Sequence, residues 1–114
     1  MRKIEQQIIA AIKARRDFIG GNTQVSLHTD TLLSVTLYRS VVAVLDGNDI
    51  RLAFCDFNTP TTVSRINCLL AALDVPYYAH IVKREGCFSS RADHKIVARG
   101  SVTLRKAGDK WGNV

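Results

Sequence analysis

The chain has 114 residues and a net charge of +6, with 46% hydrophobic and 23% charged side chains. This length suits one domain, and the composition is that of a globular protein rather than a disordered one. No apolar run approaches the roughly 18 residues that a membrane-spanning helix needs, so a transmembrane protein is excluded at the level of the sequence.

Residues 2–17 are predicted to form an amphipathic helix that ends at Gly20-Gly21. The N-terminus lacks the continuous apolar core and cleavage site of a signal peptide. The charged face of this helix is more typical of a solvated surface than of a binding face. Its apolar stripe contains Ile4, Ile8, Ala11 and Ile12.

From Asn22 onward the hydrophobic pattern alternates, which predicts strands. Arg39-Ser40 is a tight turn or a bulge, so residues 32–45 form either one bent strand or two. Asp46-Gly47-Asn48-Asp49 is a strong hairpin signal. The expected strands cover residues 24–28, 33–37, 41–45 and 50–57.

A second helix is predicted over residues 60–73, with Thr59 as N-cap and Pro60 at the first helical position. Pro76 bars its continuation. Residues 77–83 read as a strand, and 84–93 as an irregular polar segment centred on Gly86. A last strand is expected over 95–106, interrupted near Gly100-Ser101, and the tail 108–114 has little expected structure apart from Trp111.

These elements predict an α+β fold in which an antiparallel sheet of four or more strands packs with an N-terminal helix and a mid-chain helix. We expect residues 1–114 to form one domain with a basic C-terminal hairpin. The strand at Gln24 to His28 is a candidate exposed edge.

The sequence gives little support for catalysis or for metal binding. The three cysteines are too few and too widely spaced for a disulfide framework. Cys55 and Cys68 are expected to be buried, and Cys87 lies in a basic context that favours reactivity. The histidines (His28, His80 and His94) lack the close spacing of zinc ligands, and no glycine loop suits a phosphate. We therefore expect no enzyme, no metal and no cofactor.

Charge placement points to nucleic acid. Residues 1–17 carry five basic and two acidic side chains, residues 83–110 carry eight and three, and the middle is slightly negative. If the two ends meet in space, they form one basic face that attracts phosphates. Tyr77, Tyr78, Phe88 and Trp111 lie among or beside these charges and can stack on bases. The candidate nucleic-acid-binding residues are Lys13, Arg16, Arg65, Arg84, Arg91, Lys95 and Arg99.

Arg65 and Asn67 also lie near the start of the second helix, where backbone donors favour an anion. Pairing of Arg65 with Asp56 is the structural alternative. The nucleic acid is DNA or RNA. The alternative function is a non-catalytic interaction factor that inhibits a host or defence protein, and an exposed sheet edge also leaves a homodimer open.

Four segments carry a resemblance to a group of small phage-encoded proteins. They are Lys3-Ile-Glu-Gln-Gln7, Asn22-Thr-Gln-Val25, Thr61-Thr-Val-Ser-Arg-Ile-Asn-Cys-Leu69 and Arg84-Glu-Gly-Cys-Phe88. In the last segment Arg84 replaces the glycine that the group has. The resemblance implies a phage or mobile-element origin. Together with the lack of a signal-peptide pattern, it leads us to expect an accessory protein in the cytoplasm of the host cell. The resemblance implies no specific activity.

Overall fold

The computed structural model describes residues 2–114 and shows two helices and ten strands over that range. The helices are α1 (Lys3–Ala14) and α2 (Pro60–Ala72). The strands are β1 (Phe18–Gly20), β2 (Thr23–Leu27), β3 (Leu32–Leu37), β4 (Ser40–Asp46), β5 (Asp49–Ala53), β6 (Tyr77–Val82), β7 (Glu85–Ser90), β8 (Ile96–Arg99), β9 (Ser101–Ala107) and β10 (Lys110–Asn113).

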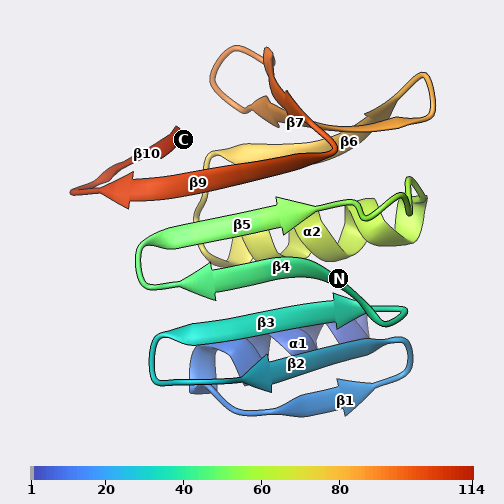
Figure 1. The fold of residues 1–114 in the computed structure, drawn as a ribbon, viewed down its shortest axis with the longest axis vertical. Helices are drawn as coiled ribbons and strands as arrows, with labels where there is room; N and C mark the ends of the chain where they lie inside the picture. Colours follow the sequence, from blue (N-terminus) through green and yellow to red (C-terminus); the bar gives the residue numbers. More distant parts are fainter. Residues whose placement is uncertain (1) are drawn as a thin grey trace.

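The strands form two antiparallel sheets (Figure 1). The large sheet has seven strands in the order β1-β2-β3-β4-β5-β9-β10, and the small sheet has three in the order β6-β7-β8. Both helices lie on the same face of the large sheet (Figure 1). The predicted α+β class is therefore confirmed. Neither helix has the length and apolar composition needed to span a membrane.

The core lies between the helices and the large sheet. One row of directly paired residues crosses five strands, and each of its members is buried. This arrangement follows from the alternating pattern, because paired residues of neighbouring strands point to the same face. Burial of each valine or leucine side chain in this row contributes about 1.5–3 kcal/mol. The row contains Val25, Val35, Ala43, Leu52 and Val102.

Helix α1 ends earlier than its sequence pattern predicts. Its last helical residue is Ala14, and Arg15 adopts the left-handed conformation with φ of 52° as the C-cap. Its backbone N–H bonds to the carbonyl of Ile12, which ends the helix without a glycine. Gly20 and Gly21 instead belong to the β1–β2 hairpin, where Gly21 has φ of 57°.

Two hairpins connect β3, β4 and β5. Tyr38 and Arg39 separate β3 from β4 and have φ values of 50° and 69°, the left-handed pair of a two-residue turn. Residues 32–45 are therefore two strands, and a bulge follows Val35 in their pairing. The predicted hairpin at Asp46 to Asp49 is confirmed, since these two residues pair across the β4–β5 turn.

Helix α2 begins as its sequence predicts. The Thr59 side chain accepts a hydrogen bond from the Thr62 backbone N–H, and Pro60 occupies the first turn. Ile66, Leu69 and Leu70 face the core, as residues spaced by three or four positions should.

The segment from residue 84 to 93 was predicted to be irregular, and this is wrong for its first half. Residues 85–90 form β7, the central strand of the small sheet. Phe88 is fully buried, and its ring lies 5.3 Å from that of Phe54, between centroids. Gly86 lies against the Phe54 ring.

Two further elements differ from the sequence prediction. Strand β5 ends at Ala53 rather than residue 57, and the tail pairs with β9 as β10.

The edges of the large sheet are β1 and β10, so the predicted edge at Gln24 to His28 is wrong. The short strand β1 pairs with β2 and covers it. The chain passes from the large sheet to the small sheet through α2. It returns from β8 to β9 through a single residue, Gly100, which has φ of 77°.

Candidate functional site

Arg65 is a buried structural residue rather than part of an exposed binding surface. Its side chain is 6% exposed, and its Nη1 lies 2.9 Å from Oε2 of Glu5 in α1. Its Nε donates to Oγ1 of Thr23 at 3.3 Å, and the Ser64 hydroxyl also donates to Glu5. Burial raises the pKa of Glu5, but Ser64, the Arg2 backbone N–H and Arg65 together outweigh it, so this pKa lies below 4.5.

Asn67, the other polar residue singled out on α2, ties the helix to the small sheet. Its side-chain amide donates to the Ala79 carbonyl at 2.9 Å and accepts from the Ala79 N–H at 2.7 Å. It thus bonds to backbone groups at the edge of β6 as a neighbouring strand would.

The partner of Arg65 is Glu5 and not Asp56, which lies in the exposed loop before α2.

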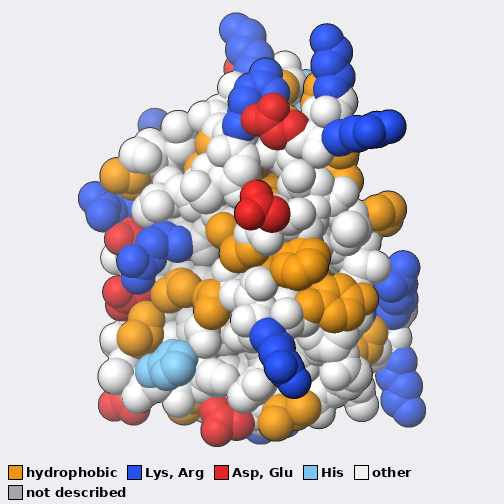
Figure 2. All heavy atoms as spheres, turned by 45° about the vertical axis from the view of Figure 1, so that its right-hand side comes forward, with side chains coloured by type: hydrophobic (Ala, Val, Ile, Leu, Met, Phe, Trp, Pro, Cys, Tyr) orange, Lys and Arg blue, Asp and Glu red, His pale blue; other side chains and the backbone are white. Residues whose placement is uncertain are grey.

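Four of the predicted binding residues lie on the small sheet. Arg84 lies in the β6–β7 turn, Arg91 and Lys95 in the β7–β8 connection, and Arg99 at the end of β8. All four are exposed, as is Lys83 beside Arg84. Figure 2 shows Lys and Arg side chains clustered at this end of the molecule, with a few carboxylates among them. This cluster is more basic than its surroundings and can attract phosphates.

A group of planar side chains accompanies these charges. Tyr78 lies in β6 with its hydroxyl 3.1 Å from Nδ1 of His94, and its ring centroid is 5.1 Å from that of His80. The guanidinium carbon of Arg91 lies 5.5 Å from the centre of the Tyr78 ring, a cation–π contact. We call Tyr78, His80, Arg91 and His94 the planar cluster.

The planar cluster continues along one face of the small sheet. Tyr78 pairs with Ser89 and His80 with Cys87, and Cys87 in turn pairs with Arg99. Directly paired side chains share a face. The Arg99 guanidinium accordingly lies 3.6 Å from the Cys87 sulfur. We call the surface carrying the planar cluster and Arg99 the outer face of the small sheet.

Most of the charges on the small sheet are not neutralised. Arg99 lies 3.9 Å from Glu85, but both side chains are about half exposed, so this pair is weak. Within residues 2–114, no carboxylate approaches within 4.0 Å of Lys83, Arg84, Arg91 or Lys95. By contrast, Arg105 on the large sheet is held by Asp49 at 2.8 and 3.0 Å.

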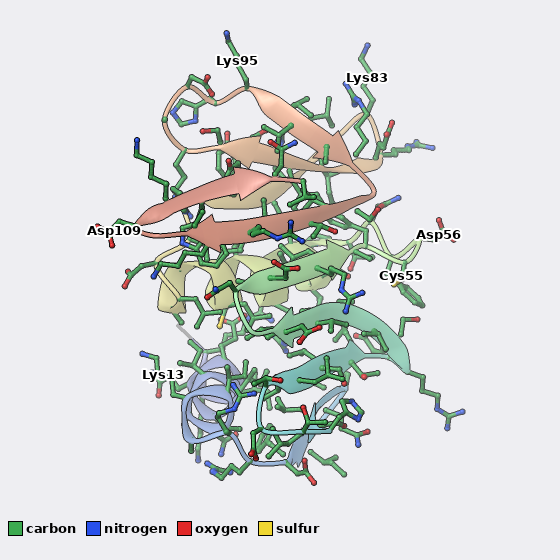
Figure 3. The ribbon with its side chains drawn as sticks, turned by 60° about the vertical axis from the view of Figure 1, so that its left-hand side comes forward. Lys13, Cys55, Asp56, Lys83, Lys95 and Asp109 are labelled. Carbon is green, nitrogen blue, oxygen red and sulfur yellow. The ribbon has the colours of Figure 1, made fainter. Side chains whose placement is uncertain are left out.

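Lys13 and Arg16 do not join this surface. Both are exposed near the end of α1, and Lys13 lies far from Lys83 and Lys95 along the molecule (Figure 3). The expectation that the basic ends form a single face with Arg84 to Arg99 is therefore wrong. Helix α1 packs on α2, β1 and β2, which places it at the opposite end of the large sheet.

The aromatic residues divide between the core and the surface. Tyr77 and Phe88 are buried and cannot stack on a base, in contrast to the sequence expectation. Tyr78 is half-buried and available. The sequence reasoning missed His80 and His94 as companions of Tyr78. Positions 78 and 80 share a face in any strand, and this spacing was the signal available for His80.

The three cysteines differ in burial. Cys87 is fully buried in β7, which places it in a strand and not in a basic loop. Cys55 is an exposed residue in the loop after β5, contrary to expectation. Partial burial of its sulfur atom and the negative charge of Asp56 raise the pKa of the Cys55 thiol. Cys68 is buried as predicted. This burial and, to a smaller extent, the negative charge of Glu5 raise the pKa of the Cys68 thiol to about 11. Among residues 2–114 no three His, Cys, Asp or Glu side chains form a metal site.

The fold and the surface define a small α+β protein whose distinctive feature is a basic sheet face carrying planar side chains. The family model described as Kyanoviridae Gp96 protein matches residues 1–100, and the chain therefore belongs to this phage protein family. The phage origin that the sequence resemblance implied is confirmed. No curated protein and no solved structure gives a significant match.

Proposed function

We propose that this phage protein is a non-catalytic accessory factor that binds single-stranded nucleic acid on the outer face of the small sheet. The observation that carries this proposal is the stacking of Arg91 and His80 about Tyr78, beside unpaired basic residues. Planar side chains stack on unpaired bases, and the cations hold the backbone.

The shape of the surface favours a single strand over a duplex. Helix α1 packs on β1 and β2, and α2 packs on β4 and β6, so neither projects from the basic surface as a recognition helix would. An open sheet face presents side chains to splayed bases instead. Arg91 lies over Tyr78 at the place where a base would stack, and we expect the base to displace it.

Fluorescence polarisation tests this proposal with labelled single-stranded DNA, single-stranded RNA and the matching duplex over a salt series. Tyr78→Ala is expected to weaken single-strand binding by about five- to a hundredfold, the value of one stacked base. Arg91→Ala should also reduce the slope of log K against log salt by about one.

Arg51→Ala is the matched control, because Arg51 is exposed on the large sheet and pairs with Asp46. It should change binding little. Absence of binding near physiological salt, or binding without a salt slope, would rule the proposal out. Equal loss in Arg51→Ala and Arg91→Ala would show that only net charge matters.

A second candidate function is interaction with a host or defence protein. It is favoured by an exposed apolar patch on the side where the β3–β4 turn meets the loop after β5 (Figure 2). Tyr38 and Phe57 lie there with ring centroids 6.0 Å apart, and Val41 is 46% exposed. Such patches mark protein contacts. A partner captured from nuclease-treated host lysate, and lost with Tyr38→Ser, would favour this function over the first.

A further inference from the structure

A groove of about 510 Å³ lies on the helix side of the large sheet, away from the small sheet. It is formed where the last turns of α1 and α2 approach the β4–β5 turn and the β9–β10 hairpin. This volume is in the range of small-molecule sites, which combine an apolar wall with a few polar groups. Its apolar wall contains Ile12, Leu45, Ile50, Leu73 and Trp111.

Three basic side chains line this groove. Lys13 and Arg15 come from the end of α1, and Lys106 comes from β9. The fold thus brings together cations from the two basic ends of the sequence. Within residues 2–114 none of the three lies within 4.0 Å of a carboxylate. The one carboxylate that lines the groove is that of Asp30.

Trp111 gives the groove an aromatic surface. It is half-buried and packs against the edge of the core. It pairs directly with Lys106 across β9 and β10, so the indole and the ammonium lie on the same face. A planar ring stacked on Trp111 would therefore have a cation beside it.

From this geometry we infer that the groove is a site for a 5′-nucleotide. The base stacks on Trp111, and the phosphate lies among Lys13, Arg15 and Lys106. Asn48 and Asp30 are placed to meet polar edges of the base or the ribose. The C-terminal ends of the helices disfavour an anion, and the three cations outweigh that partial charge. This inference does not rest on single-strand binding by the small sheet.

Trp111 is the one tryptophan in the chain, so its fluorescence reports directly on the groove. AMP is the probe, with adenosine and inorganic phosphate as half-ligands. We expect saturable quenching by AMP, at least about tenfold weaker affinity for adenosine, and competition by inorganic phosphate. Calorimetry with AMP gives the same constant without relying on the indole. The inference would be overturned if neither fluorescence nor calorimetry detected saturable binding of AMP.

Lys106→Ala should weaken AMP binding about tenfold, which is the value of one charge-assisted contact. Lys106 is exposed, and its backbone N–H bond to the Asn48 carbonyl does not need the side chain. Lys110→Ala is the matched control, because Lys110 adjoins Trp111 but does not line the groove. Equal weakening by both variants would contradict the assigned site.

Two further arms identify the source of the nucleotide. An oligonucleotide with a 5′-phosphate that quenches Trp111 far better than AMP indicates the end of a nucleic-acid chain. Equal or weaker quenching indicates a free nucleotide. Tyr78→Ala should leave AMP binding unchanged, so failure of the small-sheet proposal and failure of this one are distinguishable. Loss of AMP binding in Tyr78→Ala would contradict a separate groove site.

Discussion

Glu5 and Arg65 carry opposite charges where water scarcely reaches, with side chains 7% and 6% exposed. Burying two charges costs free energy, and the pair is tolerated because Ser64 and Thr23 supply additional hydrogen bonds. The four residues come from α1, α2 and β2. The pair therefore fixes how the two helices meet the sheet.

Glu5→Gln should lower the free energy of unfolding at neutral pH by about 3 kcal/mol, because Arg65 then remains buried without its counter-charge. Urea denaturation followed by circular dichroism measures this loss. Asp49→Asn is the control, since it breaks the exposed ion pair with Arg105 and should cost less. Equal losses in the two variants would mean that burial of the pair is unimportant.

Glu5→Gln should also change how the stability of the protein depends on pH. The pKa of Glu5 is lower in the folded state, so the unfolded chain binds its proton more readily. Its stabilisation is complete above the ordinary pKa of 4.5 and is lost as the pH falls through the lower folded value. Stability of Glu5→Gln should therefore fall less steeply below about pH 4.5 than that of the wild type.

Arg65 and Asn67 show what single residues reveal in a sequence. Their positions on α2 follow from helical spacing, and both stand out as polar residues that core packing does not require. Their partners cannot be identified from helical spacing, because Glu5 lies 60 positions from Arg65 in the chain. An unpaired arginine in a sequence thus resembles a binding residue until the fold supplies its carboxylate.

Between elements, the loop after β5 packs tightly against the start of β7. A Cβ placed on Gly86 would lie 2.3 Å from the Phe54 ring. The Phe54 ring also contacts that of Phe88, and the Phe54 backbone N–H donates a hydrogen bond to the Gly100 carbonyl. The small sheet therefore docks on the large one through a ring that needs glycine beneath it.

Gly86→Ala should destabilise the protein by about 1–3 kcal/mol, because neither the fully buried Phe54 ring nor the strand backbone can easily move aside. Gly112→Ala is the matched control. Gly112 also lies in a strand, and nothing lies within 4 Å of its Cβ position. Thermal unfolding compares them, and a similar melting temperature for both variants would contradict the tight contact.

Two tight turns of the fold use residue types that sequence patterns do not associate with turns. The β3–β4 and β6–β7 turns use Tyr38-Arg39 and Lys83-Arg84, all with positive φ. Such turns are normally signalled by Gly, Asn or Asp, and these residue pairs give no such signal. The β4–β5 hairpin has Gly47-Asn48 and was predicted correctly. Strand β7 was missed because the turn before it did not resemble one.

At the scale of the whole molecule, the two sheets share one core, and the chain connects them twice, through α2 and through Gly100. Gly100 joins β8 to β9, and its backbone N–H bonds to the Gly86 carbonyl at 2.7 Å. The radius of gyration is 13.2 Å, close to the roughly 13 Å expected for a compact domain of this length. The small sheet also uses α2 as support, through β6.

We expect the two sheets to unfold together. Hydrogen exchange at increasing urea should give β4 and β7 amides the same opening free energy and the same urea dependence, because neither sheet has a complete core alone. Opening of β7 with a smaller urea slope than that of β4 would show instead that the small sheet is an independent unit.

The distribution of charge is also a property of the whole molecule. Four predicted binding residues lie on the small sheet, and Lys13 lies at the far end of the large one (Figure 3). The C-terminal charges divide as well, since Lys106 lines the groove with Lys13. The two basic ends of the sequence thus meet, but through the β9–β10 hairpin rather than through the small sheet.

The sequence alone determined the α+β class, both helices, the start of α2, most strands of the large sheet and the enrichment of charge at the chain ends. These depend on local capping, turn residues and hydrophobic periodicity. Only the tertiary structure decided that Arg65 is buried, that β7 is a central strand, and which cations lie together. Those features depend on partners distant in the chain, and a local pattern does not encode the distance between them.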